Sequence, residues 1–168
     1  MSKVKSPRTP ILSVRQPWAE LIVAGVKVLE YRTWLSTYRG PLLIHAGTAR
    51  DPDHPKVDGP RGAVVGVVEL VEVLDGPAQA AWLKANGIEL DGPTPAPFAW
   101  RLESARRLEP IEARGRLGLW YSDHVERGYR DQLRPVRPVC GSRSCGCCAA
   151  DCACVASGES PLRCAVHA

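Results

Sequence analysis

The chain has 168 residues, of which 45% are apolar and 24% charged, so it is long enough for one domain with a buried core and an appendage. No run approaches the roughly 20 apolar residues that a membrane-spanning helix needs. The first residues, MSKVKSPRTP, also lack the apolar stretch of a signal peptide. We therefore expect a soluble, cytoplasmic protein with no membrane partner.

The net charge is +4, from 22 basic and 18 acidic residues, but it is spread unevenly. Residues 1–50 carry eight Lys and Arg against two acids, residues 51–95 carry three against eight, and residues 96–139 carry nine against six. A basic flank of this kind can attract phosphates, yet an ordinary solvated surface shows similar imbalance. Charge alone leaves both interpretations open.

All seven cysteines lie between positions 140 and 164, so residues 1–139 have no disulfide or thiolate metal site. Clustered thiolates can bind zinc or another soft metal, whereas a Gly, Ser and Ala background is typical of a disordered extension that stays reduced in the cytosol. The predicted organisation has four parts: a basic N-terminal arm (1–9), a compact domain (10–123), a basic connector (124–139) and a Cys-rich tail that is disordered or metal-dependent (140–168).

The first predicted elements are a short strand over Ile11–Val14 and a helix that Gln16-Pro17 opens, with proline near its first position. Gly25 can supply a left-handed turn at the end of this helix. An inward face is expected for the positions at i, i+3, i+4 and i+7, which are Trp18, Leu21, Ile22 and Gly25.

Residues 28–34 alternate as in a strand. One face carries Glu30, Arg32 and Trp34, and the other carries Leu29, Tyr31 and Thr33. A charged face with an aromatic residue at its end is therefore expected.

The middle of the chain predicts two more strands and a helix. Pro41–Ala46 is a strand in which His45 faces away from Leu42 and Ile44. After a loop over residues 50–62, Ala63–Leu74 is a β-branched strand with a bulge or barrel corner at Gly66.

The second helix is predicted over Ala78–Ala85 and ends at Asn86-Gly87. Three further strands are expected over Phe98–Glu103, Leu108–Ala113 and Arg116–Tyr121. Several short strands with only two short helices argue against a doubly wound parallel sheet. We expect a mainly β domain with short helices (α+β), built as a small, mostly antiparallel β-barrel.

Five segments of the chain resemble the ASCH family, from about Ile11 to Tyr121: LSVRQPWAELIVAGVKVLEYRTW, YRGPLLIHAG, VVGVVELVEV, FAWRLESARRLEP and GRLGLW. The resemblance implies that residues 10–123 are an ASCH domain, a PUA-like β-barrel with a cleft that is related to RNA-binding domains. Members of the family are proposed RNA or DNA binders, some are reported hydrolases of acylated cytidines and some are reported nucleases.

The pattern Gly25-x-Lys27-x-x-Glu30-x-Arg32 resembles the cleft motif of the family. Glu30 and Arg32 are two apart on one face, roughly 7 Å along the strand, although a mutually satisfied ion cluster on the surface would have the same pattern. Family hydrolases carry a Thr three residues after the Lys, where this chain has Glu30.

Two roles for this motif remain open. In an enzyme, Glu30 can act as general base on water, while Lys27 either has its pKa lowered by burial or stabilises an oxyanion. In a binding module, Glu30 can accept from a cytosine amino group and do no chemistry.

Other candidate binding residues surround this motif. Arg15 and the start of the first helix can bind an anion, Gln16 caps its helix or reads a base edge, and Trp18 is a ligand contact or a core residue. Trp34 stacks a nucleobase or fills the core, His45 lines the cleft or is structural, and Arg39 flanks a groove. An open groove beside Arg15, Arg32 and Arg39 would favour a single-stranded nucleic acid as the ligand. A pocket ending at Lys27 would favour a nucleoside.

The leading prediction is a nucleic-acid-binding protein that takes RNA or a modified single-stranded base in a cleft lined by Lys27, Glu30 and Arg32. The alternatives are an amidohydrolase that deacylates a modified cytidine nucleoside, an ASCH-type ribonuclease, and an adaptor whose tail recruits a protein. No metal is expected in the barrel, since no His, Cys and Asp cluster with metal-ligand spacing precedes residue 140, and no cofactor is expected.

Overall fold

A computed structural model of the chain describes residues 8–51, 59–90 and 93–134. The predicted properties of the cysteine tail fall outside these residues. The elements in chain order are β1 (Ile11–Gln16), α1 (Trp18–Val23), β2 (Leu29–Arg32), β3 (Gly40–Arg50), β4 (Ala63–Leu74), α2 (Gly76–Ala85), β5 (Phe98–Glu112), β6 (Leu119–Trp120) and α3 (Asp123–Leu133).

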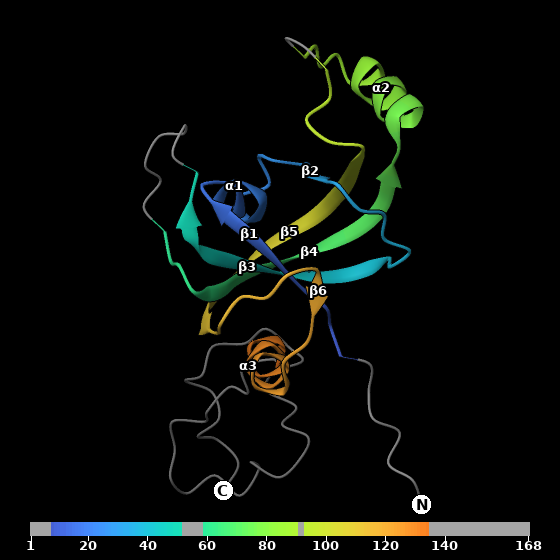
Figure 1. Cartoon of the computed structure of the whole chain (residues 1–168). Helices are drawn as coiled ribbons and strands as arrows, with labels where there is room; N and C mark the ends of the chain where they lie inside the picture. Colours follow the sequence, from blue (N-terminus) through green and yellow to red (C-terminus); the bar gives the residue numbers. More distant parts are fainter. Residues whose placement is uncertain (1–7, 52–58, 91–92, 135–168) are drawn as a thin grey trace, which may run out of the picture. The chain divides into compact units, whose positions relative to one another are not determined.

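The strands form one curled sheet in the order β2-β5-β4-β3-β1-β6, a half-barrel (Figure 1). The β1–β3 pair is parallel, and the other neighbouring pairs are antiparallel. The predicted fold class, mainly β with short helices and a mostly antiparallel barrel-like sheet, is confirmed.

The core lies on both faces of the sheet, because successive residues of a strand point to opposite sides. Leu42 and Ile44 of β3 join a cluster that α1 covers, whereas Leu43 joins a second cluster that includes Val125 and Tyr129 of α3. A smaller cluster beneath α2 contains Leu29, Leu74, Leu83 and Ala99. His45 faces away from Leu42 and Ile44, as the sequence predicted.

Helix α1 differs from its predicted orientation. Its buried residues are Ala19, Ile22 and Val23, while Trp18 and Leu21 are only half-buried. The reason is Gly66 on β4, where an added Cβ would lie 2.4 Å from Val23 Cγ1. The missing side chain lets Val23 rest directly on the sheet, which turns the helix relative to the predicted face.

Two predicted local features are confirmed. Gly25 has φ +74°, the left-handed turn expected after the first helix. Gly66 lies at irregularities in the register of β4 with both β3 and β5, as a bulge requires.

The C-terminal strands differ from the prediction. The segments Phe98–Glu103 and Leu108–Ala113 belong almost entirely to one 15-residue strand, β5. The exposed residues 104–107 between them stay in the strand because Arg106 and Arg107 pair with β4. The predicted strand Arg116–Tyr121 is reduced to Leu119–Trp120. Helix α3, for which no element was predicted, buries Val125 and Tyr129.

No helix within residues 8–51, 59–90 and 93–134 is both long enough and apolar enough to cross a membrane.

Candidate nucleic-acid interface

The predicted cleft motif forms a cluster of three charged side chains, Lys27, Glu30 and Arg32, which we call the ion cluster. Lys27 Nζ lies 2.7 Å from Glu30 Oε2, and Arg32 Nη2 lies 2.9 Å from Glu30 Oε1. The side chains of Lys27, Glu30 and Arg32 are 16%, 9% and 21% exposed. Both oxygens of one carboxylate therefore hold a cation each at a largely buried position.

Strand β2 positions two members of the cluster. Glu30 and Arg32 are two residues apart and share a face, as predicted, and Glu30 stands opposite Trp100 in the pairing with β5. Lys27 precedes the strand, so its side chain does not follow the alternation of the strand faces. Its amine donates to the Glu30 carboxylate and to the Leu29 carbonyl oxygen.

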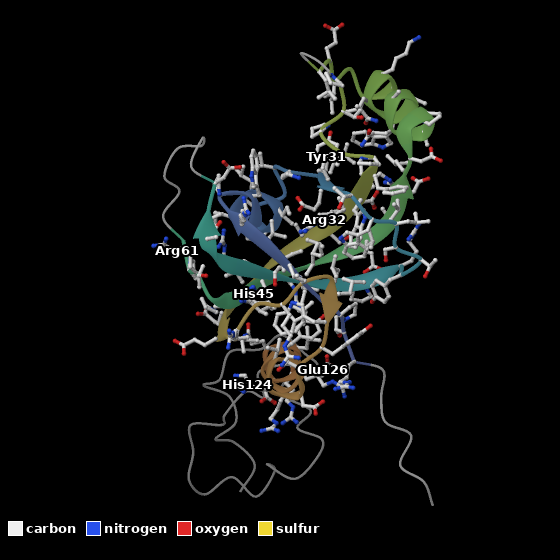
Figure 2. The ribbon with its side chains drawn as sticks, viewed as in Figure 1. Tyr31, Arg32, His45, Arg61, His124 and Glu126 are labelled. Atoms are coloured by element: carbon white, nitrogen blue, oxygen red, sulfur yellow. The ribbon has the colours of Figure 1, made fainter. Side chains whose placement is uncertain are left out.

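Arg32 also joins β2 to β1. Its Nη2 donates to the Ser13 carbonyl oxygen at 3.0 Å, although β1 and β2 are not neighbours in the sheet. Figure 2 labels Arg32 and Tyr31 beside β2. This hydrogen bond ties the sheet's edge strand β2 to the more distant strand β1.

Two aromatic rings flank the lysine amine. Lys27 Nζ lies 5.8 Å from the centre of the Trp18 ring and 5.3 Å from that of Tyr31, within the range of cation–π attraction. Trp18 Nε1 donates to Asp51 Oδ2 at 3.1 Å. Both rings are half-buried, so each keeps surface that a ligand can contact.

Burial lowers the pKa of Lys27 below its ordinary value, and the attraction of Glu30 opposes this only in part. The nearby Arg32 charge lowers this pKa further. The lysine therefore gives up its proton more readily than an exposed lysine does.

Two donors near the ion cluster have no acceptor among the described residues. They are Arg32 Nε and Trp100 Nε1, both buried. A buried donor without an acceptor costs about 1–3 kcal/mol of folding free energy, and because both atoms are enclosed, a ligand from solution does not reach them.

Lys27 also lines a hollow of about 330 Å³ next to β5. Its other walls include the apolar side chains of Ile22, Val68 and Leu102, together with Ser104. The other two members of the ion cluster do not line it.

Several other predicted binding residues have structural partners instead. Gln16 is 1% exposed, and its side chain accepts from Glu20 N in α1 and donates to the Pro60 carbonyl oxygen. It therefore caps its own helix, the first of the two predicted roles. Trp34 packs edge-on against Trp100 with 4.6 Å between ring centres.

Three predicted residues lie apart from the ion cluster. Arg15 is exposed on β1, where the alternation of the strand places its side chain on the face opposite its neighbours Val14 and Gln16. Arg39 donates to the carbonyl oxygens of Ser36 and Tyr38 in its own loop. His45 is buried and contacts the Ala113 carbonyl oxygen at 2.9 Å through Nε2, on the side of the sheet that faces α3 (Figure 2).

The site contains residues that the sequence did not single out. Tyr31 was expected to face away from Glu30, yet its ring lies beside the Lys27 amine. Ser13 contributes a backbone carbonyl, which no side-chain pattern reveals. Within the described residues, no group of three or more His, Cys, Asp or Glu side chains can hold a metal ion.

Comparison with known proteins identifies relatives of this chain. Residues 12–112 match the ASCH domain. The chain is 37% identical over 82 residues to human activating signal cointegrator 1, covering 38% of this chain and 14% of that protein. The mouse protein of the same name is 34% identical with the same coverage. The chain thus matches only about one-seventh of the length of these relatives.

Solved structures share the fold. The ASCH protein from Zymomonas mobilis has a TM-score of 0.52 at 15% identity, covering 74% of this chain and 94% of its own. A point mutant of that protein, with a tyrosine replaced by phenylalanine, also has a TM-score of 0.52, at 16% identity, covering 76% of this chain and 99% of that one. The half-barrel therefore has the fold of these ASCH structures. Because the domain match spans more than half of the sequence, the chain belongs to the ASCH domain family.

Proposed function

We propose that the protein binds RNA, or a modified base in a single strand, at the ion cluster. The observation that carries the proposal is the convergence of Lys27, Glu30 and Arg32 beside the Trp18 and Tyr31 rings, in a chain of a family that is linked to RNA binding. The cations attract phosphate, and exposed ring surface stacks bases at about 1–3 kcal/mol each.

The carboxylate has a positioning role in this proposal. Both Glu30 oxygens already accept hydrogen bonds from cations. Glu30 therefore holds Lys27 and Arg32 in place, and its negative charge offsets the repulsion between these two neighbouring positive charges. The ligand is recognised by the exposed parts of the Lys27 and Arg32 side chains and of the flanking Trp18 and Tyr31 rings. Carbonyl oxygens on base edges are acceptors for such cations.

Fluorescence anisotropy with the full chain and a mixed panel of single-stranded RNA and DNA oligonucleotides tests the proposal. We expect saturable binding at low salt that weakens steeply as salt rises, because phosphate contacts release counterions. Lys27→Ala is expected to weaken binding at least about tenfold, the loss of one charge-assisted contact. Lys84→Ala, which removes an exposed lysine on α2, is the matched control and should bind like the wild type.

Absence of saturable binding across the panel at low salt would refute the proposal. Equal loss in Lys27→Ala and Lys84→Ala would refute the site while leaving the activity. Circular dichroism of each variant separates loss of contact from loss of fold.

A second candidate function is the deacylation of a modified cytidine nucleoside. The buried Lys27 with its lowered pKa and the adjacent hollow of about 330 Å³ favour it, because this volume lies in the range of small-molecule pockets. Here Glu30 would take a proton from the attacking water and return it to the departing cytidine amino group, the acyl group would leave as a carboxylic acid, and Lys27 would stabilise the developing oxyanion.

Incubation of the protein with an acetylated cytidine, followed by mass spectrometry, tests the second candidate. Turnover by the wild type that is lost in both Lys27→Ala and Glu30→Ala would support it. Gel analysis of oligonucleotides recovered from the binding experiment tests the ribonuclease alternative, because a ribonuclease would produce shortened products. Intact nucleoside and intact oligonucleotide would leave binding as the activity.

A further inference from the structure

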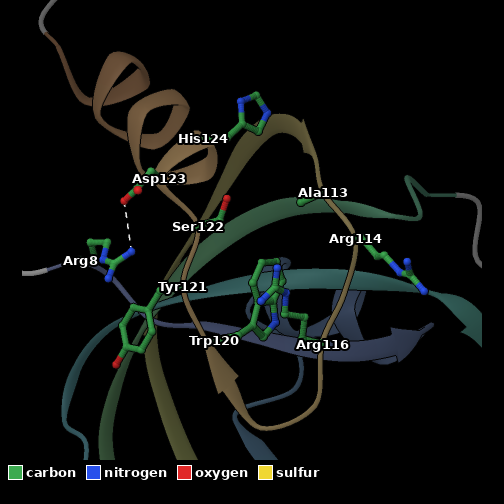
Figure 3. A pocket seen from close by; sticks show the side chains of 9 residues that line it. All are labelled: Arg8, Ala113, Arg114, Arg116, Trp120, Tyr121, Ser122, Asp123 and His124. Carbon is green, nitrogen blue, oxygen red and sulfur yellow. Dashed lines mark hydrogen bonds and ion pairs between the residues drawn. The ribbon is translucent and has the colours of Figure 1, made fainter.

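A second hollow, of about 370 Å³, lies where β6 leads into α3. Figure 3 shows its lining, and none of these residues belongs to the ion cluster: Arg8, Ala113, Arg114, Arg116, Trp120, Tyr121, Ser122, Asp123 and His124. We call it the α3 hollow.

The lining of the α3 hollow is strongly basic. Arg8, Arg114 and Arg116 contribute three positive charges, and Asp123 contributes one negative charge that Arg8 pairs with at 3.2 Å. The side chains of Arg114 and Arg116 are exposed, and neither has an acidic partner within the part of the chain that the structure describes. Two guanidinium groups are thus available to an anion from solution.

The backbone segment that carries these arginines is held by hydrogen bonds to His45 and Ser13 in the sheet. His45 Nε2 donates to the Ala113 carbonyl oxygen at 2.9 Å, and Arg116 N donates to Ser13 Oγ at 3.3 Å. Between them, Gly115 packs so closely on the imidazole that an added Cβ would lie 2.7 Å from His45 Cε1. A ligand therefore meets a loop that is already held in place, which lowers the entropic cost of binding.

An aromatic surface adjoins the basic groups. Tyr121 is 44% exposed, and the Arg8 guanidinium carbon lies 5.7 Å from the centre of its ring. Trp120 beneath is fixed by a hydrogen bond from Nε1 to Ser13 Oγ at 3.1 Å. The Arg8 guanidinium beside an exposed ring, with Arg114 and Arg116 in the same lining, matches a phosphate that is joined to a base.

We infer that the α3 hollow is a second contact site for single-stranded nucleic acid, where Arg114 and Arg116 bind phosphate and Tyr121 stacks the adjoining base. The inference rests on the proposed function, since it assigns more of the same ligand. Ser13 joins the two sites, because its carbonyl oxygen accepts from Arg32 of the ion cluster while its hydroxyl holds Arg116 and Trp120.

The test compares two double variants of the full chain in the same oligonucleotide titration. Arg114→Ala/Arg116→Ala removes the two available guanidinium groups, and Lys84→Ala/Arg106→Ala removes two exposed cations that do not line the hollow. We expect the first variant to bind more weakly and to reduce the slope of log K against log salt by about 1.4, two contacts at about 0.7 each. The control should keep the wild-type slope.

A second readout separates this inference from the proposed function. Titration of the isotope-labelled protein with uridine 5′-monophosphate should shift the Trp120 indole N–H signal, whereas uridine without phosphate should not. A signal shift with the monophosphate that vanishes in Arg114→Ala/Arg116→Ala supports the α3 hollow as a contact site. If the ion-cluster variants leave oligonucleotide binding unchanged, that result refutes only the site of the proposed function.

Equal salt slopes for the two double variants, with no phosphate-dependent shift at Trp120, would overturn the inference. Strand binding that depends on Lys27 under those conditions would leave the proposed function intact. The two failures are therefore distinguishable within one set of samples.

Discussion

Glu30 is the residue on which the ion cluster depends. It is 7% exposed as a residue and accepts from both Lys27 and Arg32. Removing its charge leaves two cations close together with no carboxylate between them, and buried unpaired charge is strongly unfavourable.

Glu30→Gln should therefore lower the free energy of unfolding by about 2–3 kcal/mol, the scale of losing hydrogen bonds to charged groups. Urea unfolding followed by circular dichroism measures it. Glu103→Gln is the control, because that carboxylate is 51% exposed and pairs with Arg101 at the surface, where a pair contributes less than about 1 kcal/mol. Similar losses in both variants would contradict a buried role for Glu30.

The buried His45 imidazole makes the free energy of unfolding depend on pH. Because a carbonyl only accepts, Nε2 carries the proton toward Ala113, and Nδ1 is buried without a partner among the described residues. Burial lowers the pKa of His45 from its ordinary value of 6.5, more than the hydrogen bond to Ala113 raises it.

The unfolded chain thus binds a proton below about pH 6.5 that the folded chain resists. The free energy of unfolding should fall as pH drops through 6.5, by up to about 1.4 kcal/mol per unit for one proton. Urea midpoints between pH 8 and pH 5 measure this slope, which should flatten in His45→Gln. His124→Gln, at an exposed position, should keep it; equal slopes in the two variants would assign the effect elsewhere.

Among the elements, α1 and β4 are joined by the absence of one side chain. An added Cβ at Gly66 would lie 2.4 Å from Val23 Cγ1 and 2.8 Å from the Arg106 carbonyl oxygen. The backbone oxygen has little freedom to yield, so α1 or the bulge must move.

Gly66→Ala should lower the free energy of unfolding by about 1–3 kcal/mol, the usual cost of overpacking. Gly76→Ala, at the start of α2 with no atom within 4 Å of the new Cβ, should raise it by about 0.4–1 kcal/mol through the unfolded chain. Thermal unfolding of the pair checks both signs. A stable Gly66→Ala protein would mean that α1 can shift without loss.

The sequence predicted those elements whose patterns are local. The valine run Ala63–Leu74 matched β4 to the residue, and Glu30 and Arg32 fell on one face as the alternation required. The orientation of α1 was missed, because it depends on a glycine 43 positions after Val23. The Ser13 carbonyl and the Tyr31 ring were missed for a similar reason, since each enters the site through contacts that no local pattern encodes.

At the scale of the whole molecule, α3 extends the folded unit beyond the residues that match the family. Val125 and Tyr129 pack against Ile11, Leu43 and Ile111 in the second core cluster. Polar and charged residues dominate the segment DHVERGYRDQL, so its sequence alone indicated a solvated connector rather than a core helix.

Tyr129→Ala should lower the free energy of unfolding by about 3 kcal/mol, near the lower end for loss of a buried aromatic side chain. Arg127→Ala, exposed in the same helix, should change it by no more than about 0.5 kcal/mol. Chemical denaturation of both proteins provides the comparison. Indistinguishable midpoints would mean that α3 is not part of the cooperative unit.

The place of β1 in the sheet has a consequence for biosynthesis. This strand leaves the ribosome before its neighbours and pairs with β3 on one side and with β6 on the other, so its outer edge stays open until residue 120 has been made. Long-range pairing of this kind delays completion of a fold. Ser13, which serves both proposed contact sites, gains its last partner with Trp120, so the nascent chain acquires its complete binding surface only in the final stage of translation of this domain.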